Sequence, residues 1–502
     1  MHLIKYAFSL AIIFIGWDFA EAQTKIGLFD NHLDIGEVKN EGFAQYHKIN
    51  QTYTVGGSGG NMWFDQDEFQ YLWTTIQGDF IVRAELEFLG KGVDPHRKAG
   101  WIIKNDLNSD TPHVNASVHG DGLTALQYRN AIKGITEENI STDSLPDVIQ
   151  LERRGSTFIM STAKFGQPFV EVKTSNASIK NQVYIGLYVC AHNADIVEVV
   201  KFRNVRIIRP AASDFKPYSD YIGSNLEIME VSTGHRKILY STANTIQAPN
   251  WTPDGKHLIY NGGGRLYKHP ISEGKISPIN TGFTIKNNND HVLTFDGSLM
   301  GISNHNEDDN NQSTLYYLRS EGDSIPVRVT PSGAGDSYLH GWSPDNSKMI
   351  FTGNRNGQFD VYTVDINTGV EQQLTEQKTL DDGAEYSPNG KYIFFNSVRS
   401  GKMKLWRMNA DGENQVQLTD DEYNDWFPHV SPDQKWIAFI SFPKDIDPSD
   451  HPFYKQCLLR IMPFNGGTPR IIGYIYGGQG TINVPSWSPD SKFISFVTNT
   501  RF

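Results

Sequence analysis

The chain has 502 residues, of which 38% are hydrophobic and 12% aromatic, with 45 glycines and a formal net charge of -12. This length exceeds what one compact core usually accommodates, so we expect two or more domains. The acidic balance, without any lysine or arginine cluster, argues against nucleic acid as a partner, and the glycine- and aromatic-rich composition favours an all-β architecture.

The first 22 residues, "MHLIKYAFSLAIIFIGWDFAEA", have the pattern of an export signal. Lys5 supplies a basic start, residues 7–17 form an apolar run too short to span a bilayer, and Ala20-Glu21-Ala22 is a small-residue cleavage motif. No later apolar stretch has spanning length. We therefore expect cleavage after Ala22 and a periplasmic or secreted protein without a transmembrane segment.

Residues 23–208 alternate short apolar runs with turns, for example "DFIVRAELEFL", "AGWIIKNDL" and "VYIGLYVCAHN". Strands at this spacing are typical of a two-sheet β-sandwich. The order of these runs resembles the concanavalin-like (jelly-roll) domains of carbohydrate-active proteins. That resemblance implies a concave, sugar-binding face, for which the candidates by residue type are Trp63, Trp101, Tyr128 and Arg129.

A proline-containing stretch without periodicity, at residues 209–221, is predicted to be a linker. The two cysteines, Cys190 and Cys457, lie on opposite sides of it. Although exported proteins commonly use cysteines in disulfides, two cysteines in different domains are more consistent with buried free thiols.

Residues 222–502 contain an internal repeat. The copies are "APNWTPDGKHLIY", "LHGWSPDNSKMIF", "GAEYSPNGKYIFF", "FPHVSPDQKWIAF", "VPSWSPDSKFISF" and the weaker "DHVLTFDGSLMGI". Successive copies are separated by 42 to 57 residues, the range expected for four-stranded propeller blades. The last copy ends at Phe502 without its outer strands, whereas residues 224–242 have the pattern of an outer hairpin. We therefore predict a six-bladed β-propeller closed by this N-terminal ribbon, which removes exposed sheet edges.

The repeated S-P-D-G-x-x-I-x-F pattern resembles the TolB-like (PD40, WD40-like) propeller family across residues 222–502. The resemblance implies the fold and suggests a cell-envelope partner. It says little about activity, because propellers host many unrelated functions.

The segments that lead into each innermost strand, and the loops between second and third strands, should open on one rim of the propeller. These segments place the following candidate ligand-binding or catalytic residues at one funnel: Asp290, His291, His305, His340, Arg355, Asp381, Asp382, Glu385, Arg399, Asp425, Trp426, His429, Lys444 and His451. The loop carrying Lys444 and His451 is longer than its counterparts, and long rim insertions usually serve function.

His291 and His340 occupy the same column of the repeat, and Glu385 and His429 share the next. Because neighbouring positions in a strand point to opposite faces, His291 with His340 is the pair expected to converge, as ligands of a divalent metal or as acid and base. His429 and Glu385 are further catalytic candidates.

Each candidate also has a structural interpretation: histidines beside turns often cap backbone groups, acids solvate loops, and the recurring arginines fit a repeat signature. Two classes of function remain open. In one, the funnel binds a glycan or cell-envelope partner and the sandwich acts as an accessory carbohydrate module. In the other, the protein is a polysaccharide lyase or glycoside hydrolase that uses the funnel residues on an acidic saccharide. A peptidase is disfavoured, since no G-x-S-x-G motif follows the repeats.

Overall fold

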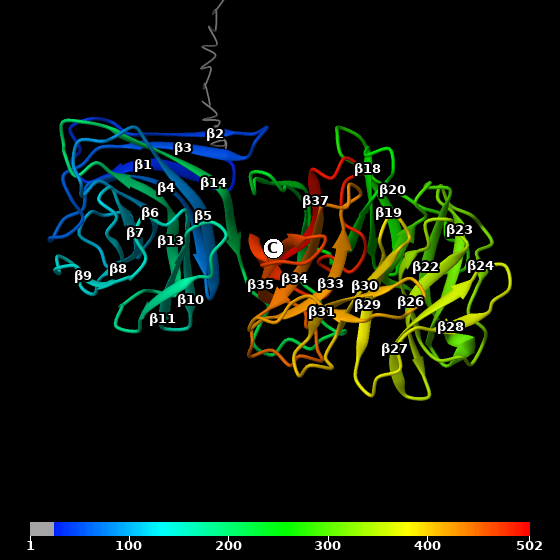
Figure 1. Cartoon of the computed structure of the whole chain (residues 1–502). Coiled ribbons are helices and arrows are strands. Elements are labelled where there is room, and N and C mark those ends of the chain that lie inside the picture. Colours follow the sequence, from blue (N-terminus) through cyan, green and yellow to red (C-terminus); the bar gives the residue numbers. More distant parts are fainter. Residues whose placement is uncertain (1–24) are drawn as a thin grey trace, which may run out of the picture.

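The computed structural model describes residues 25–502, so the predicted export segment lies outside the described residues. Within this range the chain forms 37 strands and one short 3-10 helix, η1 (Glu307–Asp309). None of the helices described there is long and apolar enough to cross a membrane. Figure 1 shows two units side by side, the first formed by the earlier part of the chain and the second by the later part.

The first unit consists of fourteen strands in two antiparallel sheets. Its strands are β1 (Asn31–Ile35), β2 (Phe43–His47), β3 (Thr52–Gly57), β4 (Phe69–Gln77), β5 (Phe80–Leu89), β6 (Lys98–Lys104), β7 (His113–His119), β8 (Thr124–Arg129), β9 (Glu137–Ile140), β10 (Val148–Arg154), β11 (Thr157–Ala163), β12 (Val170–Thr174), β13 (Gln182–Cys190) and β14 (Glu198–Ile208).

One sheet has the strand order β1-β4-β13-β6-β7-β8-β9 and the other β12-β11-β10-β5-β14-β3-β2. Both sheets contribute to one apolar cluster, with Leu72 and Trp101 from the first and Val82 and Ile149 from the second. Alternate residues of the central strands face this cluster, for example Ala99, Trp101 and Ile103 of β6, as the two-residue repeat of a strand requires. The assignment of this unit to the concanavalin-like jelly rolls stays a prediction.

The second unit is a six-bladed propeller, as predicted. Blades one to five are β17 (Gln247–Trp251), β18 (His257–Gly262), β19 (Arg265–Pro270), β20 (Ser277–Pro278); β21 (Asn287–Leu293), β22 (Leu299–Asn306), β23 (Gln312–Arg319), β24 (Val327–Arg328); β25 (Ser337–Trp342), β26 (Lys348–Arg355), β27 (Gln358–Asp365), β28 (Glu371–Gln373); β29 (Asp381–Tyr386), β30 (Tyr392–Ser397), β31 (Lys404–Asn409), β32 (Val416–Gln417); and β33 (Asn424–Val430), β34 (Trp436–Phe442), β35 (Lys455–Pro463), β36 (Arg470–Gly477).

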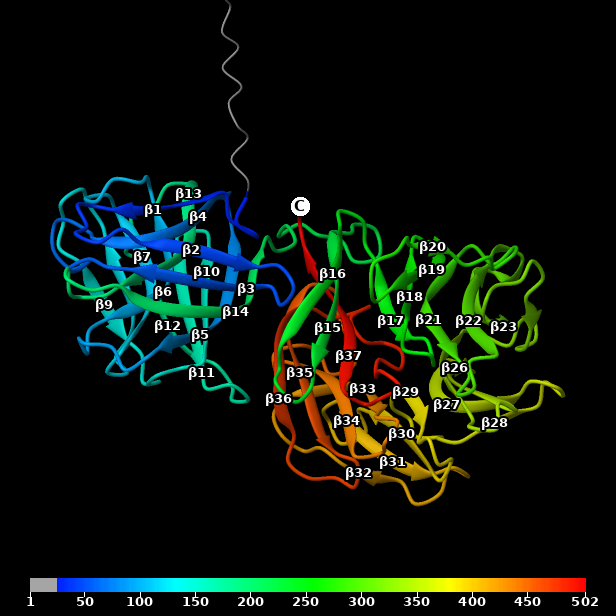
Figure 2. The ribbon, with the colours of Figure 1, turned by 90° about the horizontal axis from the view of Figure 1, so that it is seen from above.

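The sixth blade confirms the predicted closure of the ring. Its sheet combines β15 (Gly223–Glu230) and β16 (Arg236–Thr242) with the last strand, β37 (Phe493–Thr500). β15 pairs with β37 in antiparallel register along its whole length, and Figure 2 shows the two strands side by side. The innermost strand of this blade is reduced to a single bridge between Trp487 and Ile494.

The repeated turn explains why the blades share one sequence pattern. In blade one, the Thr252 hydroxyl accepts a hydrogen bond from the His257 amide at 3.1 Å, and in blade three the Ser343 hydroxyl accepts from the Lys348 amide at 2.9 Å. Gly255 then takes a φ of 69°, a left-handed conformation that glycine adopts without strain. These local bonds fix the hairpin between the innermost and second strands.

The two units are joined by direct polar contacts as well as by the linker. The Gln150 side-chain amide donates to Gln456 at 3.0 Å, and the Gln456 amide donates to Glu152 at 2.9 Å. Cys190 and Cys457 are both free and buried, which confirms the prediction of unpaired thiols.

Candidate functional site

The propeller has a cavity at each end of its innermost strands. The larger one, of about 920 Å³, is lined where innermost strands begin and second strands end, and we call it the entry pocket. The smaller one, of about 330 Å³, is lined by the prolines of the repeated turns, and we call it the turn-side pocket. Most cavities that hold a small ligand have a volume of roughly 300–1,000 Å³, so the entry pocket is the leading candidate site.

Side-chain amides form one part of the entry pocket wall. They are Gln247, Asn261, Asn287, Asn288, Asn289, Gln479 and Asn483. Three of them are consecutive, because the start of β21 bulges and exposes successive residues to the cavity. Asn261 and Asn287 use their side-chain donors on backbone carbonyls, but the Asn287 oxygen and the Asn289 nitrogen have no partner in the described part of the chain, so this wall retains an acceptor and a donor for hydroxyl groups.

Aromatic rings form a second part, and many of them come from segments between the regular strands. The linker supplies Tyr218 and Tyr221, and the long loop of blade five supplies Phe453. The Phe453 ring packs edge-on against Tyr218 at 5.2 Å and Tyr221 at 5.9 Å. The backbone amide of Gln479 donates to the Pro452 carbonyl at 3.2 Å, which ties this loop to the rim of the pocket. The linker and the long loop therefore complete the pocket together.

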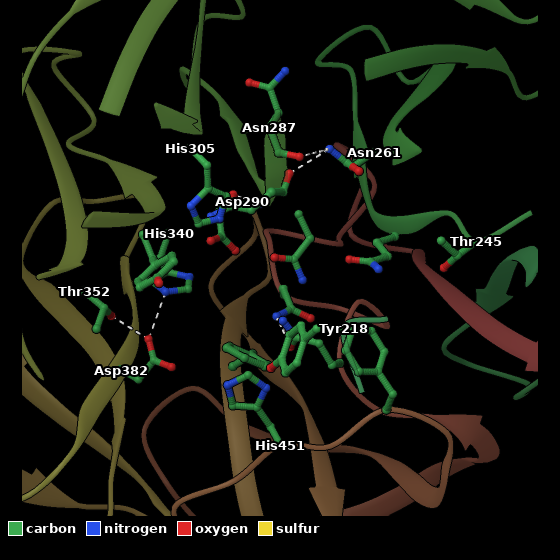
Figure 3. A pocket seen from close by; sticks show the side chains of 18 of the residues that line it. Tyr218, Thr245, Asn261, Asn287, Asp290, His305, His340, Thr352, Asp382 and His451 are labelled. Atoms are coloured by element: carbon green, nitrogen blue, oxygen red, sulfur yellow. Dashed lines mark hydrogen bonds and ion pairs between the residues drawn. The ribbon is translucent and has the colours of Figure 1, made fainter. Parts of the chain in front are cut away.

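The titratable groups of the entry pocket centre on His340 and two aspartates. His340 Nε2 lies 3.0 Å from Asp382 Oδ1, which also accepts hydrogen bonds from the Thr352 hydroxyl at 2.5 Å and the Gly383 amide at 2.7 Å. Figure 3 shows this pair beside Asp290. All three side chains of the group come from different blades, on β21, β25 and β29.

The same contacts set the protonation of the pair. Burial is the largest influence and opposes charge on both groups, but the mutual hydrogen bond and the nearby opposite charges together outweigh it, so the pKa of His340 is raised and that of Asp382 is lowered to about 2. Asp290 differs, because burial raises its pKa to about 7. The pocket thus combines an ion pair with a carboxyl group that titrates near neutrality.

His451 lies on the opposite wall, on the long loop of blade five. Its ring packs edge-on against Trp426 at 4.4 Å, and burial lowers its pKa below the ordinary histidine value. A neutral imidazole at this position can donate one hydrogen bond and accept another.

The fold and pocket can be compared with known proteins. Residues 328–451 match the family described as PD40, the TolB beta propeller domain. The chain is 40% identical over 276 residues to the uncharacterized protein Atu1656 of Agrobacterium fabrum, a match that covers 55% of this chain and 92% of that protein. The chain belongs to the TolB-like propeller family.

One solved structure agrees with this assignment. A structure assigned to TolB from Agrobacterium tumefaciens is 38% identical, with a TM-score of 0.53, and the match covers 56% of this chain and 100% of that one. TolB from Acinetobacter baumannii is 17% identical over 66% of this chain and 79% of its own, with a TM-score of 0.41, and this likeness carries no further argument.

The TolB-like propeller does not bring all the predicted site residues to the entry pocket. Asp290, His305, His340, Asp382 and His451 line the entry pocket, whereas His291, Glu385 and His429 do not. Glu385 lines the turn-side pocket instead. Its carboxylate lies 2.6 Å from His429 Nδ1 and accepts a hydrogen bond from the Val430 amide at 3.0 Å, so this pair ties neighbouring blades together.

The predicted convergence of His291 with His340 is wrong. The His291 ring lies against two backbone carbonyls, those of Asn289 at 3.1 Å and Ile259 at 3.2 Å, and burial lowers its pKa to about 4. Within residues 25–502, no group of three or more His, Cys, Asp or Glu side chains has the geometry to hold a metal ion. The structure therefore gives no support to a metal held by this pair.

A difference between two β-bulges explains why the side chains of His291 and His340 point differently although they occupy equivalent positions of the repeat. The five residues from Asn287 to His291 lie opposite three residues of β22, whereas the three residues from Leu339 to Gly341 lie opposite two residues of β26. The bulge in β21 therefore holds two extra residues and that in β25 holds one. Counted from the shared turn, His291 is still paired with Ile302, whereas His340 is the unpaired residue inside its bulge, so these equivalent positions point differently.

The predicted arginines and their acidic neighbours are structural in the TolB-like blades. Arg399 donates to Asp381 at 2.6 Å and stacks over Trp406 at 4.8 Å, and Arg355 donates to Glu371 at 2.7 Å. Neither arginine lines the entry pocket. Their recurrence reflects packing within a blade, so the prediction that they hold an acidic ligand has lost its basis.

Three further candidates are placed away from the cavity. Trp426 is fully buried in the apolar cluster of blade five and has no free face for a sugar ring. Asp425 accepts a hydrogen bond from the Ser441 hydroxyl at 2.7 Å, deep in the same blade. Lys444 forms an exposed ion pair with Glu422 at 2.9 Å.

The first unit also differs from prediction at its proposed sugar-binding face. Trp101 and Tyr128 belong to the apolar core, and Arg129 pairs with Asp67 at 2.7 Å where both side chains are fully buried. These three side chains cannot contact a sugar in this structure, since other residues cover them. Trp63 alone among the four candidates is partly exposed.

Sequence reasoning missed several residues of the entry pocket. The run Asn287–Asn289 carried a signal, because three consecutive amides are unusual at the start of a buried strand. Tyr218 and Tyr221 lie in a segment interpreted only as a linker, although two tyrosines so close together are unusual in a solvated connection. Tyr338 and Asn483 occupy ordinary strand and loop positions and carried no such signal.

Proposed function

We propose that this TolB-like propeller binds a glycan of the cell envelope in the entry pocket. The observation that carries the proposal is the pairing of seven side-chain amides with six aromatic residues around one cavity of about 920 Å³. Sugar hydroxyls both donate and accept hydrogen bonds, which amides can match. The aromatic residues are Tyr218, Tyr221, Tyr338, Phe359, Phe427 and Phe453, and such rings pack against the apolar faces of sugar rings.

The first unit fits this function as an accessory carbohydrate module of the concanavalin-like type. One of its sheets contacts the propeller directly through β10, so the two units would present their surfaces to one polymer in a fixed orientation. Export to the periplasm or the exterior, as expected from the first 22 residues, would place both units beside envelope glycans.

Calorimetric titration of a panel of neutral, acidic and amino-sugar oligosaccharides tests the proposal. We expect one class to bind, and the change Asn288→Ala to weaken its affinity about fivefold or more, since a hydrogen bond contributes about 1 kcal/mol. Asn367→Ala, at an exposed turn of blade three, serves as the control and should leave the affinity unchanged. The proposal fails if no saccharide binds, or if both variants bind as the unmodified protein does.

A carbohydrate-active enzyme is the alternative, and one observation favours it. Asp290, with a pKa raised by burial to about 7, stands near the His340–Asp382 pair, and a general acid or base works best with a pKa near the operating pH. Of the residues predicted for catalysis, His340 alone lines the entry pocket. Release of new reducing ends or unsaturated products from a bound glycan, abolished by His340→Gln but retained in His291→Gln, would establish this alternative.

A further inference from the structure

The charged groups of the entry pocket are acidic or imidazole only. Among the described residues that line it there are two carboxylates, Asp290 and Asp382, and no lysine or arginine. The nearby arginines are already engaged, Arg355 with Glu371 and Arg399 with Asp381. A ligand in this cavity therefore meets two carboxylates, and the basic side chains among these lining residues are imidazoles, those of His305, His340 and His451.

One of the two carboxylates is compensated within the protein. Asp382 accepts three hydrogen bonds, from His340, Thr352 and Gly383, and its pKa stays low because the His340 imidazole supports the ionised form. The His340–Asp382 pair is then close to neutral as a unit. It does not require a ligand charge.

Asp290 is compensated only at a distance, by the charge of His340. The residue is 4% exposed, and among residues 25–502 no hydrogen bond or ion pair reaches its carboxylate. Figure 3 shows it among the ring of lining side chains, close to His305 and His340. Ionised carboxylates buried in proteins are almost always paired, so an unpaired one at a cavity wall points to a partner that arrives with the ligand.

A neighbouring group gives an independent indication. The side-chain nitrogen of Asn289 is buried and has no acceptor in the described part of the chain, although the residue lines the entry pocket. Asn289 and Asp290 are adjacent on the bulge of β21. The Asn289 nitrogen, a donor without an acceptor, thus lies beside the Asp290 carboxylate, an acceptor without a donor. This is the arrangement expected where a hydroxyl and a cationic group of one ligand bind.

We propose that the glycan bound in the entry pocket is an amino sugar with a free amine, whose ammonium group pairs with the Asp290 carboxylate. The inference rests on the proposed function and narrows it to one class of glycan. An acidic saccharide is disfavoured, because its carboxylate would face Asp290 and Asp382 while the His340 imidazole is already paired with Asp382.

The pH dependence follows from the groups that face Asp290. These are Tyr338 and His340 on β25, Asp382 on β29, His305 on β22 and His451 on the blade-five loop. Because burial raises the pKa of Asp290 to about 7, a free carboxyl is largely protonated at pH 5.5 and offers its charge to the amine only as the pH approaches neutrality. Selectivity for the amine should accordingly weaken in acid.

Calorimetry with four matched trimers tests the inference at pH 7: glucosamine, N-acetylglucosamine, glucose and galacturonate oligosaccharides. We expect the glucosamine trimer to bind about tenfold or more tightly than the glucose trimer, the range for a hydrogen bond to a charged group. The N-acetylated trimer should resemble glucose, since acetylation removes the charge. The galacturonate trimer should bind most weakly.

Asp290→Asn separates the charge from the shape of the pocket. This variant should bind the glucosamine and glucose trimers equally, while its affinity for the glucose trimer stays within about twofold of the unmodified protein. Asp308→Asn, at an exposed acid of the same blade, is the control and should keep the tenfold preference. Thermal unfolding of Asp290→Asn checks its fold, and a variant at least as stable as the parent makes the binding data decisive.

The outcomes distinguish the two proposals. Equal binding of glucosamine and glucose trimers by the unmodified protein, or a preference that survives Asp290→Asn, overturns the amino-sugar inference and leaves glycan binding intact. Binding of no saccharide overturns both. Asp290-dependent binding of a lysine peptide without any saccharide also overturns both, since it would make the ligand a cationic peptide.

Discussion

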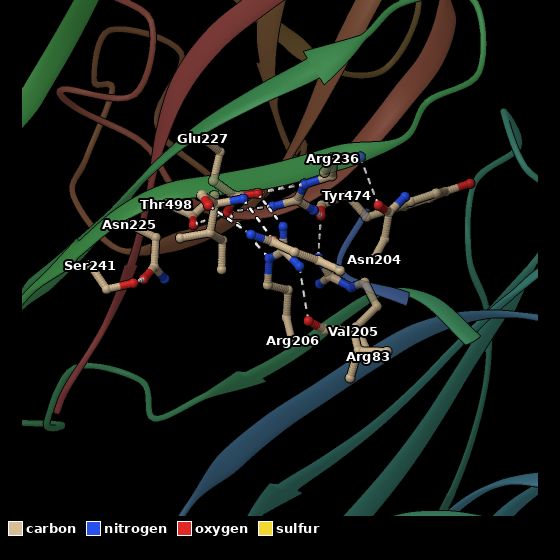
Figure 4. Close-up of polar contacts among 12 residues, drawn as sticks. Arg83, Asn204, Val205, Arg206, Asn225, Glu227, Arg236, Ser241, Tyr474 and Thr498 are labelled. Atoms are coloured by element: carbon tan, nitrogen blue, oxygen red, sulfur yellow. Dashed lines mark hydrogen bonds and ion pairs between the residues drawn. The ribbon is translucent and has the colours of Figure 1, made fainter. Parts of the chain in front are cut away.

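Two buried polar clusters of this protein differ in whether the acidic side chain at their centre is paired with other groups of the protein. One lies where the first unit meets the propeller, around Glu227 on β15, and is drawn in Figure 4. The other is the entry pocket around Asp290, drawn in Figure 3. Both centre on an acidic side chain that is almost completely shielded from solvent.

Glu227 is fully satisfied by the protein. It accepts hydrogen bonds from Arg206 at 2.5 Å, from Arg236 at 2.8 Å and from the Thr498 hydroxyl at 2.5 Å. Burial alone would raise its pKa, but the two guanidinium groups hold it at about 2. Asp290, in contrast, has no such partner, and its pKa is raised to about 7. A satisfied buried charge is a structural element, whereas an unsatisfied one at a cavity is a place for a ligand.

Replacing the satisfied carboxylate should produce the largest effect. Glu227→Gln leaves Arg206 and Arg236 buried without a counter-charge, and we expect the free energy of unfolding to fall by about 3–5 kcal/mol at pH 7. Because the folded pKa lies below the unfolded value, this stabilisation is present above about pH 4 and is lost as the pH falls toward 2. Urea denaturation at several pH values measures this free energy of unfolding.

The exposed pair between Lys268 and Glu321 provides the matched control for this change, since exposed ion pairs contribute little. Glu321→Gln should leave the urea midpoint nearly unchanged. If Glu227→Gln were no more destabilising than the control, the cluster at the junction of the two units would not be a stabilising element.

Replacing the carboxylate of the entry pocket is expected to change the free energy of unfolding in the opposite direction. Asp290→Asn should raise the free energy of unfolding by about 2–4 kcal/mol at pH 8, because each unit of pKa shift corresponds to about 1.4 kcal/mol. The folded pKa lies above the unfolded one, so the ionised carboxyl destabilises the unmodified protein progressively as the pH rises from about 4 to about 7. Below pH 4 the two proteins should be equally stable.

Urea midpoints at pH 4 and pH 8 check this sign, with Asp308→Asn as the exposed control. A variant less stable than the parent at pH 8 would show that Asp290 has a partner in solution and would remove the contrast with Glu227. Function commonly requires such destabilising groups, and removing them stabilises the fold at the expense of binding.

The architecture was predictable because it is repeated. Six copies of one turn motif, each with its own hydroxyl and left-handed residue, predicted the blade number, and the incomplete last copy predicted the closing ribbon. Periodicity of this kind is set locally, by turn chemistry and alternation along a strand. It needs no knowledge of distant contacts.

The site was only partly predictable because it depends on departures from the repeat. Asp290 lies inside the bulge of β21 and lines the cavity, whereas His291 is paired next to the bulge and does not line it, and nothing in the repeat alignment reveals that difference. Arg399 looked like a ligand contact because its partner Asp381 is brought near only by the fold. Tyr218 entered the pocket from a linker, a class of segment for which the repeat makes no prediction.

The linker therefore provides the smallest but most specific test of the contrast. Tyr218 is 68% exposed, lines the entry pocket and makes an edge contact with Phe453. Tyr218→Ala should change the free energy of unfolding by less than about 0.5 kcal/mol, as is usual at the surface. It should weaken glycan affinity about three- to tenfold, because aromatic contacts contribute about 0.5–1.5 kcal/mol.

An exposed aromatic residue outside the pocket, Phe283, which is 58% exposed and packs edge-on against Tyr316, is the matched control. Phe283→Ala should leave glycan affinity unchanged in calorimetry. If the two variants behaved alike, the linker would be a connection only. A loss confined to Tyr218→Ala would show that the segment joining the two units is part of the binding site, because neither the blades nor the first unit would have changed.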